Sequence, residues 1–230
     1  MNRLTHLSEK KDLFVIIPGF MGDFESEFLS DIRETLTKQN CDYWTWNFKG
    51  YAKENAILGS ISELIFQTKK ELEIIRTLFP EKNLYFITYS QGAYIMARVF
   101  NELNYSYPTI MLTPALDLTN IILQRLDGDE ADKIQTDRQI LKTFKNGKSR
   151  ILNTKWYTEY KDIPTNFQTP TNKFISIWGE QDFIVGQKDK NILDRILENK
   201  AIYLNGDHTF SGDFRTNFLL EMIKIIKSLI

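Results

Sequence analysis

The chain has 230 residues, with 29 lysines and arginines against 30 aspartates and glutamates, so its formal net charge is −1. A near-neutral chain that is 42% apolar can bury a core, which excludes intrinsic disorder, and it has no excess of positive charge for binding nucleic acid. Cys41 is the single cysteine and can form no internal disulfide, and two histidines leave little for a zinc site. We therefore expect neither a metal nor another cofactor.

The location of the protein is predicted from three further features. No apolar run approaches the roughly 20 residues that span a bilayer. Residues 1–12 contain no apolar stretch of signal-peptide length. With one cysteine, the sequence therefore favours a cytoplasmic protein without a membrane span.

Apolar runs alternate with helical patterns along the chain. The recurrence of Phe24, Phe28, Ile32 and Leu36 at every fourth position predicts a helix, and similar stripes occur within 57–79, 92–100, 192–197 and 218–229. Short apolar or aromatic runs predict strands at 13–17, 41–46, 84–89, 109–113, 173–178 and 201–204. This alternation predicts an α/β fold with a mostly parallel sheet of about six strands, flanked by helices.

Residues 117–170 interrupt the alternation with a charged stretch, a Gly-Lys turn at 147–148 and two prolines. We expect a loop-rich cap insertion at 117–170, with a solvated helix in 123–142, on a core made of 1–116 and 171–230. The cap offers apolar surface for an acyl or aromatic group, although the same side chains could simply pack the cap against the sheet. These residues are Trp156, Tyr157, Tyr160 and Phe167.

The sequence Thr88-Tyr89-Ser90-Gln91-Gly92 joins a predicted strand to a helix of small residues. A serine at such a turn is held above the sheet in a strained conformation, and its neighbours must be small. Ser90 is therefore our candidate nucleophile, although Ser-x-Gly alone can occur by chance.

A serine hydroxyl needs a general base, and only two histidines are available. His208 follows the last predicted strand at the carboxyl edge of the sheet, whereas His6 precedes the first strand. The candidate acid is Asp182, on the loop after 173–178, and Asp117 is its main rival. Glu180 and Asp207 are further carboxylates near this edge.

Acyl transfer also needs two donors for the oxyanion of the tetrahedral intermediate. The backbone N–H of Gln91 lies at a helix N-terminus and can supply one. The loop Pro18-Gly19-Phe20-Met21-Gly22 can supply the other, and we choose the N–H of Phe20, with Met21 next and also a candidate pocket residue.

These motifs together resemble those of the α/β-hydrolase superfamily over nearly the whole chain. Ser90-Gln91-Gly92 resembles its nucleophile elbow, and the order of serine, acid and histidine is the family's order. Two positions differ from the family's pattern: Thr88 stands where glycine is usual, and Pro18 stands where many members have histidine.

The resemblance implies a serine hydrolase of carboxylesterase type that cleaves a small or medium acyl ester through a Ser-His-Asp triad and an acyl-enzyme. Thioesterases and C–C bond hydrolases share this triad and fold and remain alternatives. A binding protein without turnover is a third possibility, motivated by Thr88 and Pro18. A lipase acting at a membrane surface would need a broad apolar lid, which the charged stretch 123–142 does not provide. A peptidase is disfavoured because only Glu159 or Asp162 could hold a substrate amine in the cap.

Overall fold

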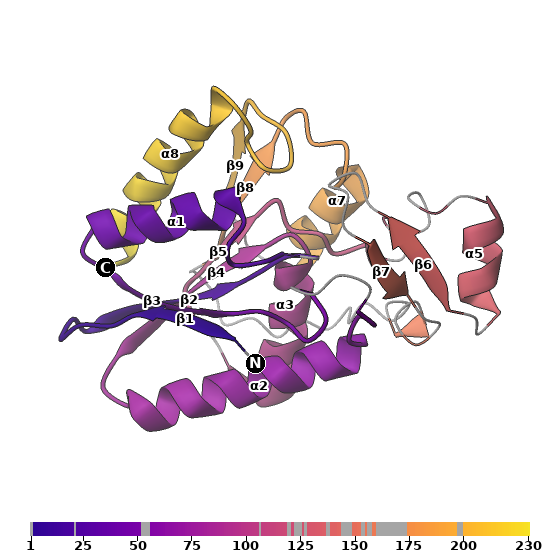
Figure 1. Ribbon diagram of the computed structural model, residues 1–230. Helices are drawn as coiled ribbons and strands as arrows, with labels where there is room; N and C mark the ends of the chain where they lie inside the picture. Colours follow the sequence, from indigo (N-terminus) through magenta and orange to yellow (C-terminus); the bar gives the residue numbers. More distant parts are fainter. Residues whose placement is uncertain are drawn as a thin grey trace.

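A computed structural model gives the structure of the chain (Figure 1). It describes residues 2–20, 22–51, 56–105, 107–118, 121, 126, 128–136, 139–143, 149–152, 155, 158–159, 174–196 and 200–230.

A seven-stranded sheet forms the centre of the molecule, in the order β1-β3-β2-β4-β5-β8-β9. Six of these strands pair in parallel, and β1 pairs antiparallel with β3 at one edge. The mostly parallel α/β fold predicted from the sequence is confirmed, with one strand more than the six expected. The strands are β1 (Arg3–His6), β2 (Asp12–Ile17), β3 (Asp42–Trp46), β4 (Asn83–Tyr89), β5 (Thr109–Leu112), β8 (Phe174–Gly179) and β9 (Lys200–Leu204).

The extra strand, β1, is held by polar contacts rather than by an apolar run. The guanidinium of Arg3 pairs with the buried carboxylate of Glu71, with 2.8 Å between Nε and Oε2. The indole Nε1 of Trp44 donates to the same oxygen at 3.0 Å. An exposed edge strand of this kind leaves no apolar pattern, which explains why the sequence did not predict it.

Of the helices in the described ranges, five cover the two faces of the sheet (Figure 1). Side chains alternate along each strand, so that Leu13, Val15 and Ile17 of β2 pack toward one helical layer and Phe14 and Ile16 toward the other. Among the described residues, none of the helices combines the length and the apolar character needed to cross a bilayer. The first layer holds α2 (Ile61–Leu78), α3 (Gln91–Leu103) and α7 (Gln187–Ile196), and the second holds α1 (Glu27–Lys38) and α8 (Phe214–Leu229).

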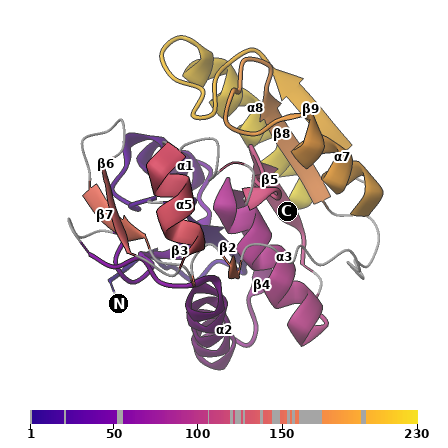
Figure 2. The same ribbon diagram turned by 90° about the vertical axis from the view of Figure 1, so that its right-hand side faces the viewer.

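The segment 117–170 contributes elements of its own, which lie together beside the central sheet in Figure 1 and face the viewer in Figure 2. They are the helix α5 (Gly128–Gln135) and the antiparallel pair β6 (Ile140–Thr143) and β7 (Ser149–Leu152). The helix expected over 123–142 is therefore wrong at its end, because Ile140 begins a strand. Ile140 is buried and Leu141 is exposed, and this alternation suits a hairpin strand.

The hairpin is attached to the core through the backbone. The N–H of Leu58 donates to the carbonyl of Ile151 at 3.2 Å, and the N–H of Ile151 donates to the carbonyl of Ala56 at 3.1 Å. These bonds fix the position of β7 relative to the segment that follows β3.

Candidate active site

The candidate residues from the sequence lie on loops at the carboxyl edge of the sheet. Ser90 follows β4, Asp182 follows β8 and His208 follows β9. Ligands bind at this edge in open α/β sheets, because the loops there surround a crevice between neighbouring strands. The edge is therefore the place to examine for chemistry.

Ser90 occupies a sharp turn between β4 and α3. Its backbone angles are φ 49° and ψ −118°, and non-glycine residues rarely adopt a positive φ. Three backbone bonds hold the strained turn: the Ser90 N–H donates to Leu112 O at 2.9 Å, and its carbonyl accepts from Ala93 and Ala115. The Ser90 hydroxyl makes no hydrogen bond to any described residue, so it is available to a base or a substrate.

Two glycines allow the loop after β2 to lie against this turn. A Cβ on Gly92 would be 2.5 Å from the carbonyl oxygen of Ile17, and a Cβ on Gly19 would be 2.9 Å from the ring Cδ1 of Tyr89 and 3.0 Å from the Cβ of Ser90. Real Cβ atoms essentially never lie within 3.0 Å of such atoms. Both positions therefore require glycine, and the close approach brings the loop at 18–20 next to Ser90.

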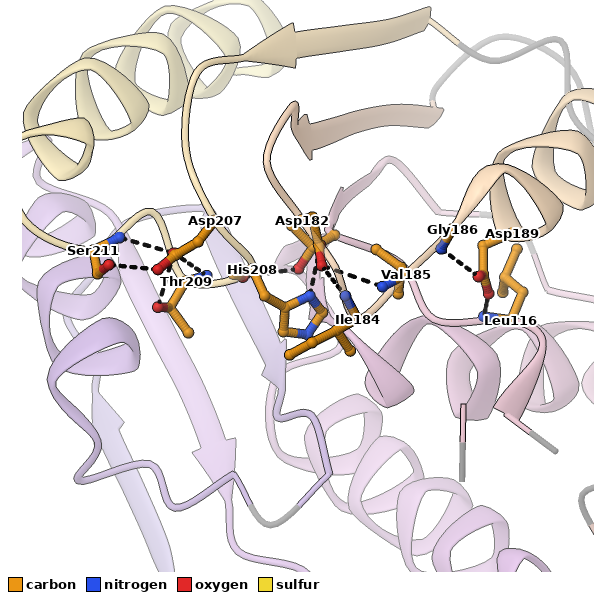
Figure 3. A network of polar contacts seen from close by, with 11 residues as sticks. Leu116, Asp182, Ile184, Val185, Gly186, Asp189, Asp207, His208, Thr209 and Ser211 are labelled. Carbon is orange, nitrogen blue, oxygen red and sulfur yellow. Dashed lines mark hydrogen bonds and ion pairs between the residues drawn. The ribbon is translucent and has the colours of Figure 1, made fainter. Parts of the chain in front are cut away.

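Asp182 and His208 are joined by a short hydrogen bond (Figure 3). The His208 Nδ1 lies 2.7 Å from the Asp182 Oδ2, and both side chains are buried. The other carboxylate oxygen of Asp182 accepts from the N–H groups of Ile184 and Val185 at 2.8 and 3.2 Å. The carboxylate is thus fixed by its own loop and in turn fixes one nitrogen of the imidazole, leaving Nε2 on the opposite side of the ring.

The close contact between the two loops depends on glycine as well. A Cβ on Gly179 would lie 2.4 Å from the carbonyl oxygen of Gly206 and 2.6 Å from that of Asp207. The loops that carry Asp182 and His208 therefore meet backbone to backbone at Gly179. Because the loops approach so closely, the Asp182 carboxylate lies within hydrogen-bond distance of the His208 imidazole.

Contacts from two residues that the sequence reasoning missed place His208 beside the serine turn. The ring of Tyr89, directly before Ser90, has its centroid 5.3 Å from that of His208. The hydroxyl of Thr113 donates to the His208 carbonyl at 3.2 Å. Tyr89 ends β4 and Thr113 follows β5, its neighbour in the sheet. Their positions at the carboxyl ends of apolar runs are the sequence signal that could have indicated them.

The rival residues make other contacts. Asp117 pairs with Lys188, with 2.7 Å between Oδ2 and Nζ. Glu180 is exposed. His6 lies on the edge strand β1, where its ring stacks on Tyr43 at 5.8 Å. None of these three contacts His208 in the described part of the chain.

Asp207 serves its own loop instead of the neighbouring imidazole (Figure 3). Its carboxylate accepts from the backbone N–H and hydroxyl groups of Thr209 and Ser211. Burial tends to raise the pKa of Asp207, but the bonds from Ser211 and Thr209 outweigh burial and hold the pKa below its usual range. Asp207 therefore stabilises the turn that carries His208.

Asp189 is a second structural carboxylate that the sequence reasoning missed (Figure 3). It accepts from the N–H groups of Leu116 and Asp117 at 2.7 and 2.8 Å and from that of Gly186 at 3.0 Å. Burial raises the pKa of Asp189 despite these bonds. It ties the loop after β5 to the loop of Asp182, and its place in the first turn of α7 was the available signal.

The two candidate oxyanion donors follow the neighbouring strands β2 and β4. Gln91 is the first residue of α3, where backbone N–H groups have no acceptor within the helix. Phe20 follows β2, and its ring meets the edge of the Tyr51 ring at 5.9 Å. The N-terminus of α3 thus directs an unpaired donor and a positive dipole end toward Ser90.

Thr88, which replaces the usual glycine, lies fully buried in β4. It pairs in register with Ile17 and Met111. Its hydroxyl has no hydrogen-bond partner among the described residues. The fold accommodates the threonine at the expense of one unpaired buried hydroxyl.

The expected pocket residues lie outside the described residues. They are Met21, Trp156, Tyr157, Tyr160 and Phe167. Within the described ranges, no group of three or more histidine, cysteine, aspartate or glutamate side chains could hold a metal ion.

The fold is similar to that of solved hydrolases and esterases. Est1E from Butyrivibrio proteoclasticus with ferulic acid bound superimposes with a TM-score of 0.75 at 16% identity, covering 99% of this chain and 94% of that one. The mouse α/β hydrolase domain-containing protein 10 gives 0.69 at 14% identity, covering 100% and 94%. XC6422 from Xanthomonas campestris, described as a serine hydrolase without lid, gives 0.62 at 14% identity, covering 98% and 88%.

A scan against models of known protein families gives no match, and neither does a comparison with the sequences of curated proteins. The likeness therefore lies in the three-dimensional arrangement, over the full length of the chain. The protein has the α/β-hydrolase fold, as its motifs had indicated.

Proposed function

We propose that this protein is a serine hydrolase of carboxylesterase type that cleaves small or medium acyl esters with Ser90, His208 and Asp182. The observation that carries the proposal is the buried 2.7 Å contact between Asp182 and His208, beside a serine held at positive φ. A strained serine turn, an imidazole fixed at Nδ1 and a helix N-terminus together supply a nucleophile, a base and an oxyanion donor.

Acylation of Ser90 is the first half of the proposed reaction. His208 Nε2 takes the proton of the Ser90 hydroxyl while Oγ forms a bond to the ester carbonyl carbon, and the carbonyl π electrons move to oxygen. The N–H groups of Gln91 and Phe20 bind this oxyanion. When the intermediate collapses, the bond to the leaving alkoxide breaks, and the alkoxide takes the proton from His208. Asp182 keeps the Nδ1 proton in place and stabilises the imidazolium throughout.

Deacylation repeats the steps with water as the nucleophile. His208 takes a proton from water as its oxygen bonds to the acyl carbon, and the second tetrahedral intermediate expels the Ser90 oxygen, which regains the proton. The products are a carboxylic acid and an alcohol, and the enzyme returns to its starting state.

The fold and the site support acyl transfer, but they do not indicate which acyl group is transferred. One structural neighbour, Est1E, has ferulic acid bound, and this supports a small acyl group without identifying it. We propose that the aromatic residues of 117–170 give the substrate pocket its apolar surface, and that the protein acts in the cytoplasm, since its single cysteine can form no internal disulfide.

Two measurements test the proposal. A fluorophosphonate probe should label Ser90 of the intact protein and fail on Ser90→Ala, and equal labelling of both would refute the nucleophile. A panel of nitrophenyl esters, acyl-CoA thioesters and dienol ketones should show ester cleavage at the highest kcat/KM. Faster turnover of the thioesters or the ketones would instead indicate a thioesterase or a C–C bond hydrolase.

His208→Ala separates an enzyme from a binding protein that keeps the fold without turnover. Hydrolysis of an activated ester should fall by at least about 10³-fold in this variant, because the serine then has no base. His6→Ala is the matched control and should keep the activity of the unmodified protein. Ester hydrolysis that is unchanged in both variants would show that the base is not a histidine.

A further inference from the structure

Tyr51 is a buried tyrosine that contacts both residues of the proposed oxyanion hole. Its hydroxyl donates to the side-chain Oε1 of Gln91 at 2.8 Å, and its ring meets that of Phe20 edge-on at 5.9 Å. Tyr51 is fully buried and Gln91 is 1% exposed. The tyrosine therefore connects the first residue of α3 with the loop after β2, the two segments that carry the proposed donors.

The side chain of Gln91 depends on this one hydrogen bond. Its Nε2 is buried and has no hydrogen-bond partner, so the bond from Tyr51 to Oε1 is the one polar contact of this amide with the described residues. A buried amide that is satisfied at neither end is unfavourable, and it would rotate to find a partner. The backbone N–H of the same residue is the proposed oxyanion donor, so a shift of Gln91 that accompanies the loss of this bond would move the donor as well.

Tyr51 is fixed from the side of the insertion. The guanidinium Nη2 of Arg150, a fully buried residue of β7, donates to the backbone carbonyl of Tyr51 at 2.6 Å. The ring of Phe48 packs against the ring of Tyr51 at 5.5 Å, and the N–H of Tyr51 donates to the carbonyl of Phe48 at 3.0 Å. The position of the tyrosine is therefore set jointly by the core and by the hairpin β6–β7.

We propose that Tyr51 is a positioning residue that holds Gln91 so that its backbone N–H points at the developing oxyanion, and that it ties this donor to the hairpin of the insertion through Arg150. The inference rests on the proposed acyl transfer. Tyr51 acts through Gln91, so it should affect the transition state more than the binding of the ester. A residue needed only for stability would not produce that difference.

Tyr51→Phe removes the hydroxyl and keeps the ring contacts with Phe20 and Phe48. We expect kcat for p-nitrophenyl acetate to fall roughly tenfold with KM changed less than twofold, because a small misplacement of an oxyanion donor weakens only transition-state binding. Affinity for a trifluoromethyl ketone, whose adduct carries an oxyanion, should fall by a similar factor. Titration with a fluorophosphonate counts the folded sites, so that partial misfolding does not lower the apparent kcat.

The matched control is Tyr94→Phe, which removes the hydroxyl of another buried tyrosine, in α3. This hydroxyl accepts from Arg98 at 3.3 Å, and its loss should leave kcat unchanged. Gln91→Leu supplies the second arm, because it removes the amide that Tyr51 holds. In that background, Tyr51→Phe should lower kcat less than twofold.

The outcomes separate the inference from the function on which it rests. If the unmodified protein shows Ser90-dependent hydrolysis but Tyr51→Phe keeps its kcat, the inference alone is overturned. A tenfold loss that persists in the Gln91→Leu background, or an equal loss in Tyr94→Phe, also overturns it. If the unmodified protein shows no Ser90-dependent labelling or hydrolysis, the proposed function and the inference both fail.

Discussion

The bond between Asp182 and His208 leads to the sharpest test of the proposed mechanism, the substitution Asp182→Asn. The Oδ1 of asparagine can still accept from the N–H groups of Ile184 and Val185, which lie 2.8 and 3.2 Å from the carboxylate. The side-chain NH₂ then occupies the place of Oδ2, 2.7 Å from the His208 Nδ1. A donor in this place requires Nδ1 to be an acceptor, so the imidazole proton moves to Nε2.

An imidazole that is protonated at Nε2 cannot take the proton of Ser90. We expect kcat for p-nitrophenyl acetate to fall about 10³- to 10⁴-fold, which corresponds to about 4 to 5.5 kcal/mol of transition-state stabilisation. The free energy of unfolding should fall by only about 1–2 kcal/mol, because one charge-assisted bond is replaced by a neutral one and the loop contacts remain. Urea denaturation measures the stability, and circular dichroism shows that the variant is folded, since the probe itself needs the activated serine.

The controls are Asp207→Asn and Asp117→Asn. Asp207 adjoins His208 in sequence but bonds to Thr209 and Ser211, and Asp117 pairs with Lys188. Each variant should keep more than a tenth of the activity. If Asp182→Asn also keeps more than a tenth, or if Asp117→Asn loses as much, then the acid has been assigned to the wrong residue.

Three other predictions concern stability. Thr88→Val removes a buried hydroxyl without a partner and should raise the free energy of unfolding by about 1 kcal/mol in urea denaturation; a decrease would show that the hydroxyl is satisfied. Gly92→Ala should lower the free energy of unfolding by about 1–3 kcal/mol and reduce ester hydrolysis, because its Cβ would lie 2.5 Å from the Ile17 carbonyl oxygen. Gly128→Ala, at a position in α5 with open space around it, should not destabilise the protein, and equal effects of the two substitutions would contradict the packing argument. Burial tends to raise the pKa of Asp42, but the hydrogen bonds from Lys82 and Ser8 outweigh burial and lower this pKa. The carboxylate therefore stabilises the fold above its unfolded pKa of about 3.9, and this contribution is lost as the pH falls through the folded pKa. The difference in unfolding free energy between the unmodified protein and Asp42→Asn should thus shrink from pH 6 to pH 3, and a constant difference would contradict it.

The sequence predicted those parts of the fold that depend on local pattern. The buried parallel strands are continuous apolar runs, and residues that follow such strands meet at one edge of the sheet, which is why Asp182 and His208 could be paired before the structure was known. The strand β1 and the hairpin β6–β7 could not be predicted, because polar pairing and backbone bonds to distant segments hold them. Arg150 contacts Tyr51 across 99 positions of the chain, and no local pattern predicts such a contact.

Thr88 illustrates how a departure from a family's pattern can be interpreted once the packing is known. Glycine is expected two residues before the nucleophile because the turn is crowded, and a β-branched residue there suggested a damaged site. In this structure, however, the closest backbone approaches at the turn fall on Gly92 and Gly19, where a Cβ would lie 2.5 Å from the Ile17 carbonyl oxygen and 3.0 Å from the Ser90 Cβ. Thr88 lies within β4, buried and in regular register with its neighbours. The steric requirement of the turn is therefore met by the other two glycines. What the threonine adds is a hydroxyl without a hydrogen-bond partner in the described part of the chain, which bears on stability and gives no steric reason for a loss of catalysis.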